Sequence, residues 1–254
     1  SLEDIANLVQ YAHQFGVQVL VTLNTLLHEE EYARACALAH ELYKVGVDAL
    51  IIQDLNLLQY ELPPIRLHAS TQCDNRTVEQ VIHLQELGFR RVVLARELSL
   101  DEIKTIHNAV SKTTAANQPP IELEAFVHGA LCVSYSGQCY LSEALMNRSA
   151  NRGCCAQLCR QRYDLLDSNM NEILDNEGKA IHQRYLLSLQ DMDRSLNLAE
   201  LIEAGVTTFK IEGRLKDRDY VTNIVAYYRQ LLDQIIDNSS CLQTASIRSI
   251  YHYD

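Results

Sequence analysis

Apolar positions recur along the chain with two different periods. Segments in which they return every three or four residues predict amphipathic helices, and shorter runs rich in β-branched residues predict buried strands. We expect strands at residues 17–25, 47–54, 65–70, 90–96, 121–128 and 206–213. We expect helices at residues 1–16, 29–46, 55–60, 75–88, 99–110, 199–205 and 218–237. Short apolar strands that alternate with helices are typical of a parallel sheet with both faces covered.

The six predicted strands are too few for a closed (β/α) barrel, which has eight. The chain also starts on a helix that no strand precedes, and an uncovered sheet edge is unfavourable. We therefore expect an α/β fold, a parallel (β/α) TIM-type barrel that lacks one or two βα units at its N-terminus. The partial barrel would occupy residues 1–237, and residues 238–254 would form an irregular tail.

Two segments interrupt this alternation. Residues 111–120 are polar, end in two prolines and predict a linker. Residues 129–182 form an insertion before the last strand. Its first part, 129–160, is rich in cysteine, and its second part, 161–182, predicts a β-hairpin with a turn near Asn169 to Glu172.

Charge narrows the range of partners. The chain has 33 acidic and 22 basic residues and a net charge of −11, a poor balance for a protein that binds nucleic acid by charge alone. No apolar stretch is long enough to span a membrane, and no signal-peptide pattern opens the chain. These features favour a small-molecule enzyme, or one module of something larger, in the cytoplasm.

Polar residues follow the predicted strands at their C-terminal ends, where (β/α) barrels carry their chemistry. Helix capping accounts for Asp54, Ser70 and Ser99. Lys210 and Arg214 suggest a corner that binds a carboxylate or phosphate. The candidate catalytic residues are Glu124, His128, Lys210 and Glu212. The candidate substrate-binding residues are Asn24, His68, Gln72, Arg96 and Arg214.

Residues 132–159 contain five of the eight cysteines, namely Cys132, Cys139, Cys154, Cys155 and Cys159. In a reducing compartment, clustered cysteines are more often metal ligands or catalytic groups than disulfides. Their spacing leaves a structural zinc site and an iron–sulfur cluster equally open. Cys36, on the apolar stripe of a helix, and Cys241, in the tail, are expected to bear no ligand.

The segment "EAFVHGALCVSYSGQCYLS", followed by "NRGCCAQLCR", resembles the signature of the collagenase-like peptidases of unassigned catalytic mechanism. The flanks "VTLNTL", "GVDALIIQD", "LHASTQ", "RVVLARELSL" and "GVTTFKIEGRLK" resemble the same family, so that the resemblance covers residues 1–236. It implies that two N-terminal strands and a C-terminal domain lie outside this chain.

The resemblance also implies a cofactor. The family includes RNA- and quinone-hydroxylating proteins that hold a four-iron four-sulfur cluster on four cysteines and work without molecular oxygen. The RNA-modifying members use prephenate, a dicarboxylate that would suit Lys210 and Arg214. Cys132, Cys139 and Cys155 match the ligand positions of the family. The fourth ligand is assigned to Cys159, with Cys154 in reserve, although some relatives take it from the place that Asp193 occupies here.

Three functions are open on the sequence. The first is oxygen-independent hydroxylation of rRNA or tRNA, with RNA bound in part by regions outside this chain. The second is hydrolysis of peptide bonds, for which Cys132 and His128, four residues apart, are the candidate Cys–His pair. The third is a binding or scaffold module with structural zinc.

Overall fold

The sheet of the molecule is parallel except at one short strand. The structure is a computed structural model that describes residues 1–113 and 119–238. Strands β1 (Leu20–Leu23), β2 (Ala49–Ile52), β3 (Arg66–Ala69), β4 (Arg91–Val93), β5 (Glu122–Gly129) and β7 (Val206–Ile211) pair in this order, all in parallel. Strand β6 (Met192–Asp193) pairs antiparallel with the end of β5. All six predicted strands are therefore confirmed.

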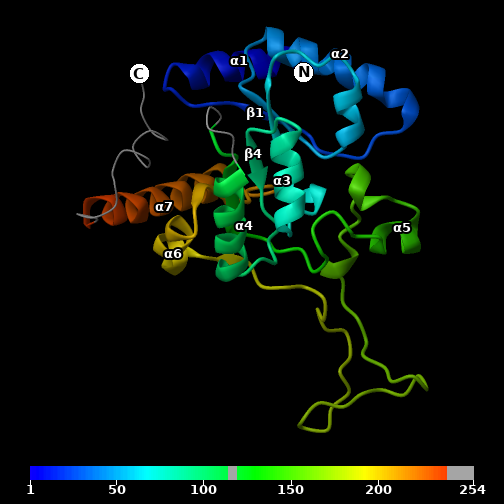
Figure 1. Cartoon of the computed structure of the whole chain (residues 1–254). Coiled ribbons are helices and arrows are strands. Elements are labelled where there is room, and N and C mark those ends of the chain that lie inside the picture. The colour runs from blue at the N-terminus through cyan, green and yellow to red at the C-terminus, as the bar shows by residue number, and fades with distance from the viewer. Residues whose placement is uncertain (114–118, 239–254) are drawn as a thin grey trace.

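Helices separate the strands (Figure 1). They are α1 (Leu2–His13), α2 (Tyr32–Lys44), α3 (Val78–Glu86), α4 (Leu100–Thr113), α5 (Leu141–Met146), α6 (Leu198–Glu203) and α7 (Arg218–Asn238). Short 3-10 helices are η1 (Glu29–Glu31), η2 (Leu55–Gln59), η3 (Thr71–Cys73), η4 (Ala150–Arg152), η5 (Leu158–Arg160) and η6 (Ser195–Asn197). The helix expected at 55–60 is thus a 3-10 helix. Residues 114–118 of the expected linker and 239–254 of the expected tail, with Cys241, lie outside the described residues.

The expected capping residues do cap. Asp54 accepts a hydrogen bond from the backbone N–H of Asn56 at the start of η2, and Ser70 accepts one from Gln72 at the start of η3. Ser99 accepts one from Glu102, whose carboxylate accepts the backbone N–H of Ser99 in return. All three caps bond backbone N–H groups that have no carbonyl partner at the start of a helix, and the cap at Ser99 is reciprocal.

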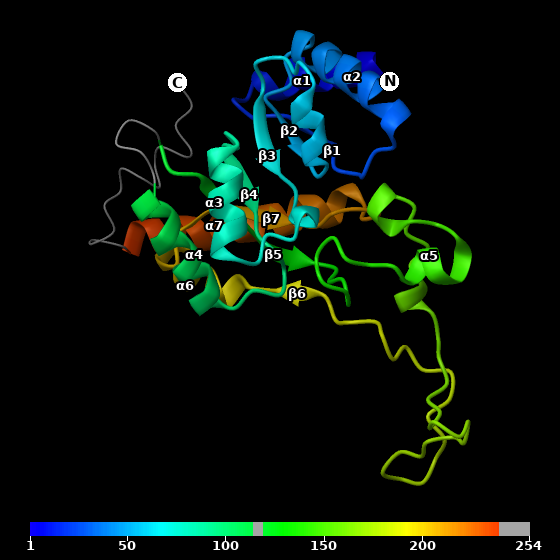
Figure 2. The same ribbon diagram turned by 45° about the vertical axis from the view of Figure 1, so that its right-hand side comes forward.

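The sheet is an open barrel. Strand β1 pairs with β2 alone and β7 pairs with β5 alone, so β1 and β7 are the edges of the parallel part of the described sheet. The α/β architecture of a partial (β/α) barrel is therefore confirmed. Figure 2 shows β5 directed towards the insertion, so the C-terminal ends of the strands and the cysteine-rich segment lie on the same side of the molecule.

The two faces of the sheet differ in chemistry. Side chains on the outer face of the strands join residues of the surrounding helices in one buried apolar cluster, which includes Leu50, Ile52, Ala69, Val92, Leu123, Ala125 and Val127. Because successive side chains of a strand point to opposite faces, His68, Arg91 and Glu124 lie on the inner face. The inner face of this open barrel is therefore charged where the outer face is apolar.

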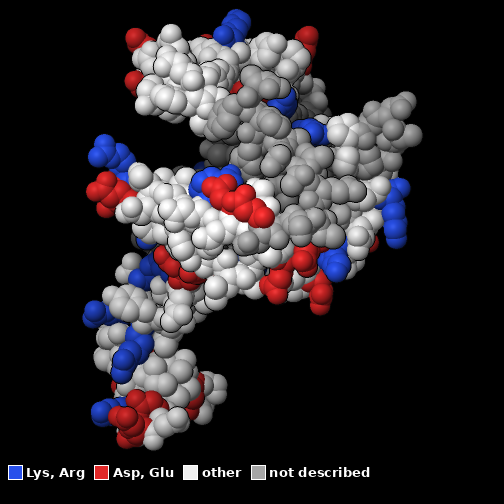
Figure 3. Space-filling model, turned by 90° about the vertical axis from the view of Figure 1, so that its left-hand side faces the viewer, with Lys and Arg blue, Asp and Glu red and all other residues white. Residues whose placement is uncertain are grey.

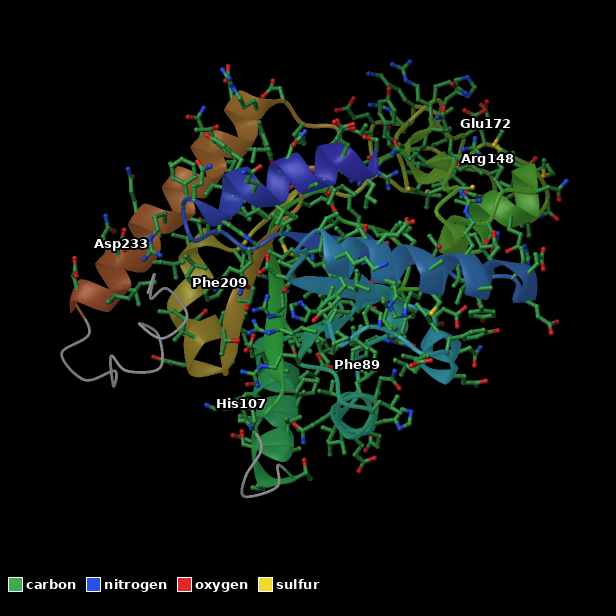
Figure 4. The ribbon with its side chains drawn as sticks, turned by 90° about the horizontal axis from the view of Figure 1, so that it is seen from above. Phe89, His107, Arg148, Glu172, Phe209 and Asp233 are labelled. Atoms are coloured by element: carbon green, nitrogen blue, oxygen red, sulfur yellow. The ribbon has the colours of Figure 1, made fainter. Side chains whose placement is uncertain are left out.

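The insertion has two parts. Residues 130–160, with α5, lie against the barrel, whereas the chain after them projects as an arm (Figures 1 and 2). Strand pairing in the arm is limited to the isolated bridges Tyr163–Arg184, Leu166–Glu172 and Leu174–Ala180. Figure 3 shows acidic and basic side chains next to one another on the arm, and Figure 4 places Arg148 and Glu172 of the insertion far from Asp233 of α7.

The arm differs from the single regular hairpin expected at 161–182. It contains two tight turns, one from Asp167 to Asn171 and one from Asp175 to Lys179. The carboxylate of each aspartate accepts backbone N–H groups two and four residues later. Such side-chain bonds stabilise local turns in place of a continuous strand ladder.

Two glycines that follow helices provide a matched test of the packing of α6 on α4. Gly205 has φ +93°, and a Cβ placed on it would lie 2.2 Å from the ring of His107, a residue of α4 labelled in Figure 4. Gly88 has φ +89°, and a Cβ there would meet no atom within 4 Å. A side chain is therefore unfavourable at both positions because of the backbone conformation, but only at position 205 does packing also exclude it.

We expect Gly205→Ala to lower the free energy of unfolding by more than Gly88→Ala. Both substitutions place a side chain in left-handed backbone, a penalty of about 1–2 kcal/mol, and only the first adds an overlap with His107. Urea denaturation of both variants measures the difference, which should shrink when His107→Ala is the background. An equal decrease in the free energy of unfolding for the two variants would show that His107 does not exclude a side chain at position 205.

Candidate functional site

Glu124 is the centre of a charged cluster on the inner face of the sheet. Its side chain is buried, with the residue 4% exposed. Its carboxylate accepts hydrogen bonds from Lys210 Nζ at 2.9 Å and from Arg91 Nη1 at 3.4 Å. The two cations come from the strands on either side, β7 and β4. A buried carboxylate needs such partners, because an unpaired charge in the interior is strongly unfavourable.

A β-bulge turns Lys210 towards Glu124. Val206 pairs with Leu123 and Thr208 pairs with the next residue, Glu124, so the register of β7 shifts by one residue between them. Without that extra residue, Lys210 would share the outer face with Val206. The structure thus places Lys210 on the inner face.

Glu212 lies on the same face as Lys210. Arg96 Nη2 donates a hydrogen bond to Glu212 Oε2 at 3.4 Å, and the Arg96 guanidinium lies 4.0 Å from the centroid of the Phe126 ring. Lys210 Nζ lies 5.6 Å from the centroid of the same ring. Glu124, Lys210, Arg96 and Glu212, four of the candidate residues, are therefore brought together around Phe126.

His68 lies in the positive field of this cluster. The residue is 3% exposed, and burial, followed by the charges of Arg91, Lys210, Arg66 and Arg90, lowers its pKa to about 3. Its imidazole is therefore neutral at neutral pH. Its Nδ1 is buried without a hydrogen-bond partner.

The expected anion-binding corner of Lys210 and Arg214 differs from the structure in one respect. Lys210 is not a free cation, because it pairs with Glu124. Arg214 is exposed, just beyond β7, and its backbone N–H donates to Glu212 Oε1 at 2.9 Å. An anion at this corner would bind the remaining donors of Lys210 and Arg96 and the guanidinium of Arg214.

Asn24 and Gln72 do not join the charged cluster. Asn24 Nδ2 donates to Ser70 Oγ at 3.4 Å, and Gln72 lines a separate pocket with Gln53. Asn24 and Gln72 therefore lie outside the charged cluster. The C-terminal end of the open barrel has two regions, the charged cluster and a pocket lined by amide, leucine and charged side chains.

His128 is held by α7. Its Nδ1 lies 3.3 Å from Tyr228 Oη, which in turn lies 2.8 Å from Val127 O and 3.1 Å from Asp193 Oδ1. Among the described residues, the hydrogen bond of the His128 ring is thus to tyrosine and not to Cys132. His128 and Cys132 do not form the hydrogen-bonded pair that peptide hydrolysis would need.

The thiols of the insertion lie within range of one another's charge. The pKa of Cys159 is raised, first by burial and then, against the opposing effect of Arg160, by Cys132, Cys155 and Cys139. Cys154 is not among these groups, and its charge acts instead on Arg152. The charges of the other three cysteines assigned as ligands therefore reach Cys159, whereas that of Cys154 acts on Arg152.

A single-ion site is not formed by these cysteines. Within residues 1–113 and 119–238, no three His, Cys, Asp or Glu side chains stand close enough together to coordinate one metal ion. A zinc ion would need four such ligands at bond distance.

Two residues of the cluster were not anticipated as site residues. Arg91 stands at the start of β4, away from the strand ends at which functional residues were sought. Phe126 belongs to the family-like segment but is apolar, and no titratable group marks it in the sequence. The alternation of charged residues with apolar ones in "ELEAF" is the signal that points to this face.

Comparison with known proteins identifies the family. The model described as "Peptidase family U32" matches residues 1–252. The chain belongs to this family. The resemblance seen in the cysteine-rich segment and its flanks is thereby confirmed.

Relatives of this U32 chain carry different names. It is 50% identical over 254 residues to the "23S rRNA 5-hydroxycytidine C2501 synthase" of Escherichia coli (strain K12), covering 100% of this chain and 36% of the relative. It is 34% identical over 239 residues to the "tRNA hydroxylation protein P1" of Bacillus subtilis (strain 168), covering 92% and 54%. It is 32% identical over 234 residues to a "Collagenase" of Porphyromonas gingivalis (strain ATCC BAA-308 / W83), covering 91% and 55%.

The chain spans from about a third to just over half of the length of these relatives. In the part that the structure describes, no helix is both long enough and apolar enough to cross a membrane.

We expect the U32 chain to lose stability between pH 6.5 and pH 3 because of His68. Its folded pKa of about 3 lies below the ordinary value near 6.5, so the unfolded state binds a proton first and stability falls as the pH falls through this window. At pH 5 the contribution is about 2 kcal/mol. Urea denaturation at pH 5 and pH 7 should show a smaller pH dependence for His68→Gln and an unchanged one for His83→Gln, an exposed control on α3.

Proposed function

We propose that this U32 chain is part of an enzyme that hydroxylates a base of RNA without molecular oxygen. The proposal is carried by the cysteines of the insertion at the C-terminal side of the sheet, three of which act by charge on Cys159, because a group of thiols suits redox chemistry better than hydrolysis. The 50% identity to a protein named as a 5-hydroxycytidine synthase favours cytidine of ribosomal RNA as the substrate. We propose the cytoplasm as the site of the reaction, where ribosomal RNA is present.

Cys132, Cys139, Cys155 and Cys159 would hold a four-iron four-sulfur cluster. The donor set fits, because such clusters are held by four cysteine thiolates and accept loops of unequal length between them. The ligands of a cluster also lie farther apart than those of one ion, which agrees with thiols that act on one another without meeting around a point. When bound, the cluster would supply electron transfer.

The charged cluster would bind a dicarboxylate co-substrate, for which we propose prephenate. The groups that act on His68 by charge are all cations, Arg91, Lys210, Arg66 and Arg90, so this part of the inner face attracts anions although the chain as a whole has a net charge of −11. Lys210 has N–H donors beyond the one used by Glu124, and Arg96 and Arg214 offer forked donors that match carboxylates.

Peptide hydrolysis is the weaker assignment. It needs a nucleophile next to a base that removes its proton, or a metal-bound water. The ring of His128 bonds to Tyr228 and the described residues hold no single-ion site.

The acidic balance of the chain remains unfavourable for RNA, so most phosphate contacts are assigned to regions of the protein outside this chain.

We expect Cys139→Ser in the intact protein to abolish both the cluster and RNA hydroxylation, whereas Cys154→Ser should keep both. Cys139 acts on the Cys159 thiol and Cys154 does not. Iron and sulfide analysis and absorbance near 400 nm, on protein purified without oxygen, measure the cluster. Mass spectrometry of RNA nucleosides measures the product. A Cys139→Ser variant that keeps its iron and its activity would overturn the ligand assignment.

We expect Arg214→Met to raise the KM for the dicarboxylate about tenfold or more, the size of effect that follows from the loss of one charge-assisted hydrogen bond. Arg214 is exposed, so folding should be unaffected. Arg218→Met, in an exposed residue at the start of α7 that pairs with Asp219, is the control. Steady-state kinetics at saturating RNA measures the KM for the dicarboxylate in both variants. An equal KM for the two variants would exclude Arg214 from the co-substrate site.

A further inference from the structure

A pocket of about 550 Å³ lies where the insertion meets the barrel, apart from the charged cluster. The barrel supplies Gln53 and Leu55 at the end of β2 and Gln72 after β3. The insertion supplies Tyr140 and Asn151. The volume of the pocket is typical of sites that bind small molecules or single nucleotides.

Fixed contacts hold the two sides of the pocket together. Gly137 has φ +77°, and a Cβ on it would lie 2.1 Å from Gln72 O, so the insertion touches the backbone of η3 here. On the other side, Arg152 Nη1 donates to Leu26 O at 2.8 Å, and the guanidinium bonds both carboxylate oxygens of Glu31 at 2.9 and 3.0 Å. The pocket is therefore formed before any ligand binds.

Gln53 has an acceptor without a partner. The residue is 6% exposed, its Nε2 donates to Gln72 O at 3.4 Å, and its Oε1 is buried with no hydrogen bond. Because a carbonyl oxygen can only accept, the amide nitrogen must face Gln72 and the orientation of the carboxamide is determined. Buried polar atoms are nearly always paired, so the free Oε1 points to a ligand that donates.

The rest of the lining favours a neutral, flat ligand. Glu143 adds a carboxylate acceptor, Asp74 is already paired with Arg76, and Arg152 is already paired with Glu31, so an anion would find little free positive charge. Leucine side chains and the exposed ring of Tyr140 offer apolar surface on which a base could stack.

We propose that this pocket binds the target base of the RNA, turned out of its strand, and that Gln53 Oε1 accepts a hydrogen bond from the exocyclic amino group of cytosine. The inference rests on the proposed function, since enzymes that react with a base take it out of the stack. Uracil presents an oxygen at the same place, which would face Oε1 acceptor to acceptor. The pocket lies beside the cysteine loop, because Gly137 and Tyr140 flank Cys139 in the sequence.

The test compares Gln53→Met, which keeps the volume of the side chain and removes the acceptor, with Gln59→Met, an exposed control on η2. Isothermal titration of the intact, cluster-loaded protein with the nucleosides cytidine and uridine measures binding. Hydroxylation is measured on rRNA from a strain that lacks the gene. The wild type should bind cytidine at least tenfold more tightly than uridine, Gln53→Met should lose this preference and raise the KM for RNA, and Gln59→Met should change neither.

Failure of the pocket assignment and failure of the proposed function give different results. A wild type that hydroxylates rRNA, with a Gln53→Met variant that keeps the cytidine preference and the KM, overturns the pocket and leaves the function standing. A wild type that prefers cytidine through Gln53 but forms no hydroxylated nucleoside supports the pocket and overturns the function. Should Gln53→Met fail to fold, Tyr140→Ala, in an exposed side chain, should weaken both nucleosides alike, and unchanged binding would overturn the pocket.

Discussion

The buried carboxylate of Glu124 determines how the inner face of the open barrel is arranged. A charge that is 4% exposed is stable only with its partners in place, and these come from the two adjacent strands. Lys210 reaches it through the bulge in β7, and Arg91 reaches it from β4. Burial, followed by the charges of the same cations, keeps His68 neutral. One carboxylate thus links three strands and sets the electrostatic field that the co-substrate would meet.

Two regions of opposite chemistry result at the C-terminal side of the sheet. The charged cluster is rich in cations, whereas the pocket beside the insertion is rich in acceptors and has its arginine already paired. On charge alone, an anionic co-substrate would therefore bind at the charged cluster and a neutral base in the pocket. The thiols belong to the insertion that forms one wall of the pocket, which places the proposed cluster near the proposed base site.

The insertion depends on the barrel for its position. It contains one short α-helix, α5, and its arm holds few regular backbone pairs. It is attached through Gly137 on Gln72, through Ser136, whose N–H and hydroxyl each donate to Glu97 at 3.0 Å, and through Arg152 on Glu31. These contacts span both sides of the pocket, so a change in any of them would alter the pocket and the cysteine loop together.

The sequence by itself determined the α/β class, the six parallel strands, the caps at Asp54, Ser70 and Ser99 and the U32 family, because periodicity, capping and the spacing of cysteines are local properties of a chain. Tertiary structure decided the rest. The bulge that turns Lys210 inward depends on pairing with β5. The split of the rim into a charged cluster and an amide-lined pocket depends on which strand ends the insertion covers. Distances between residues remote in sequence, such as Arg91 and Glu124 or Gly137 and Gln72, are set by packing, and no local pattern encodes them.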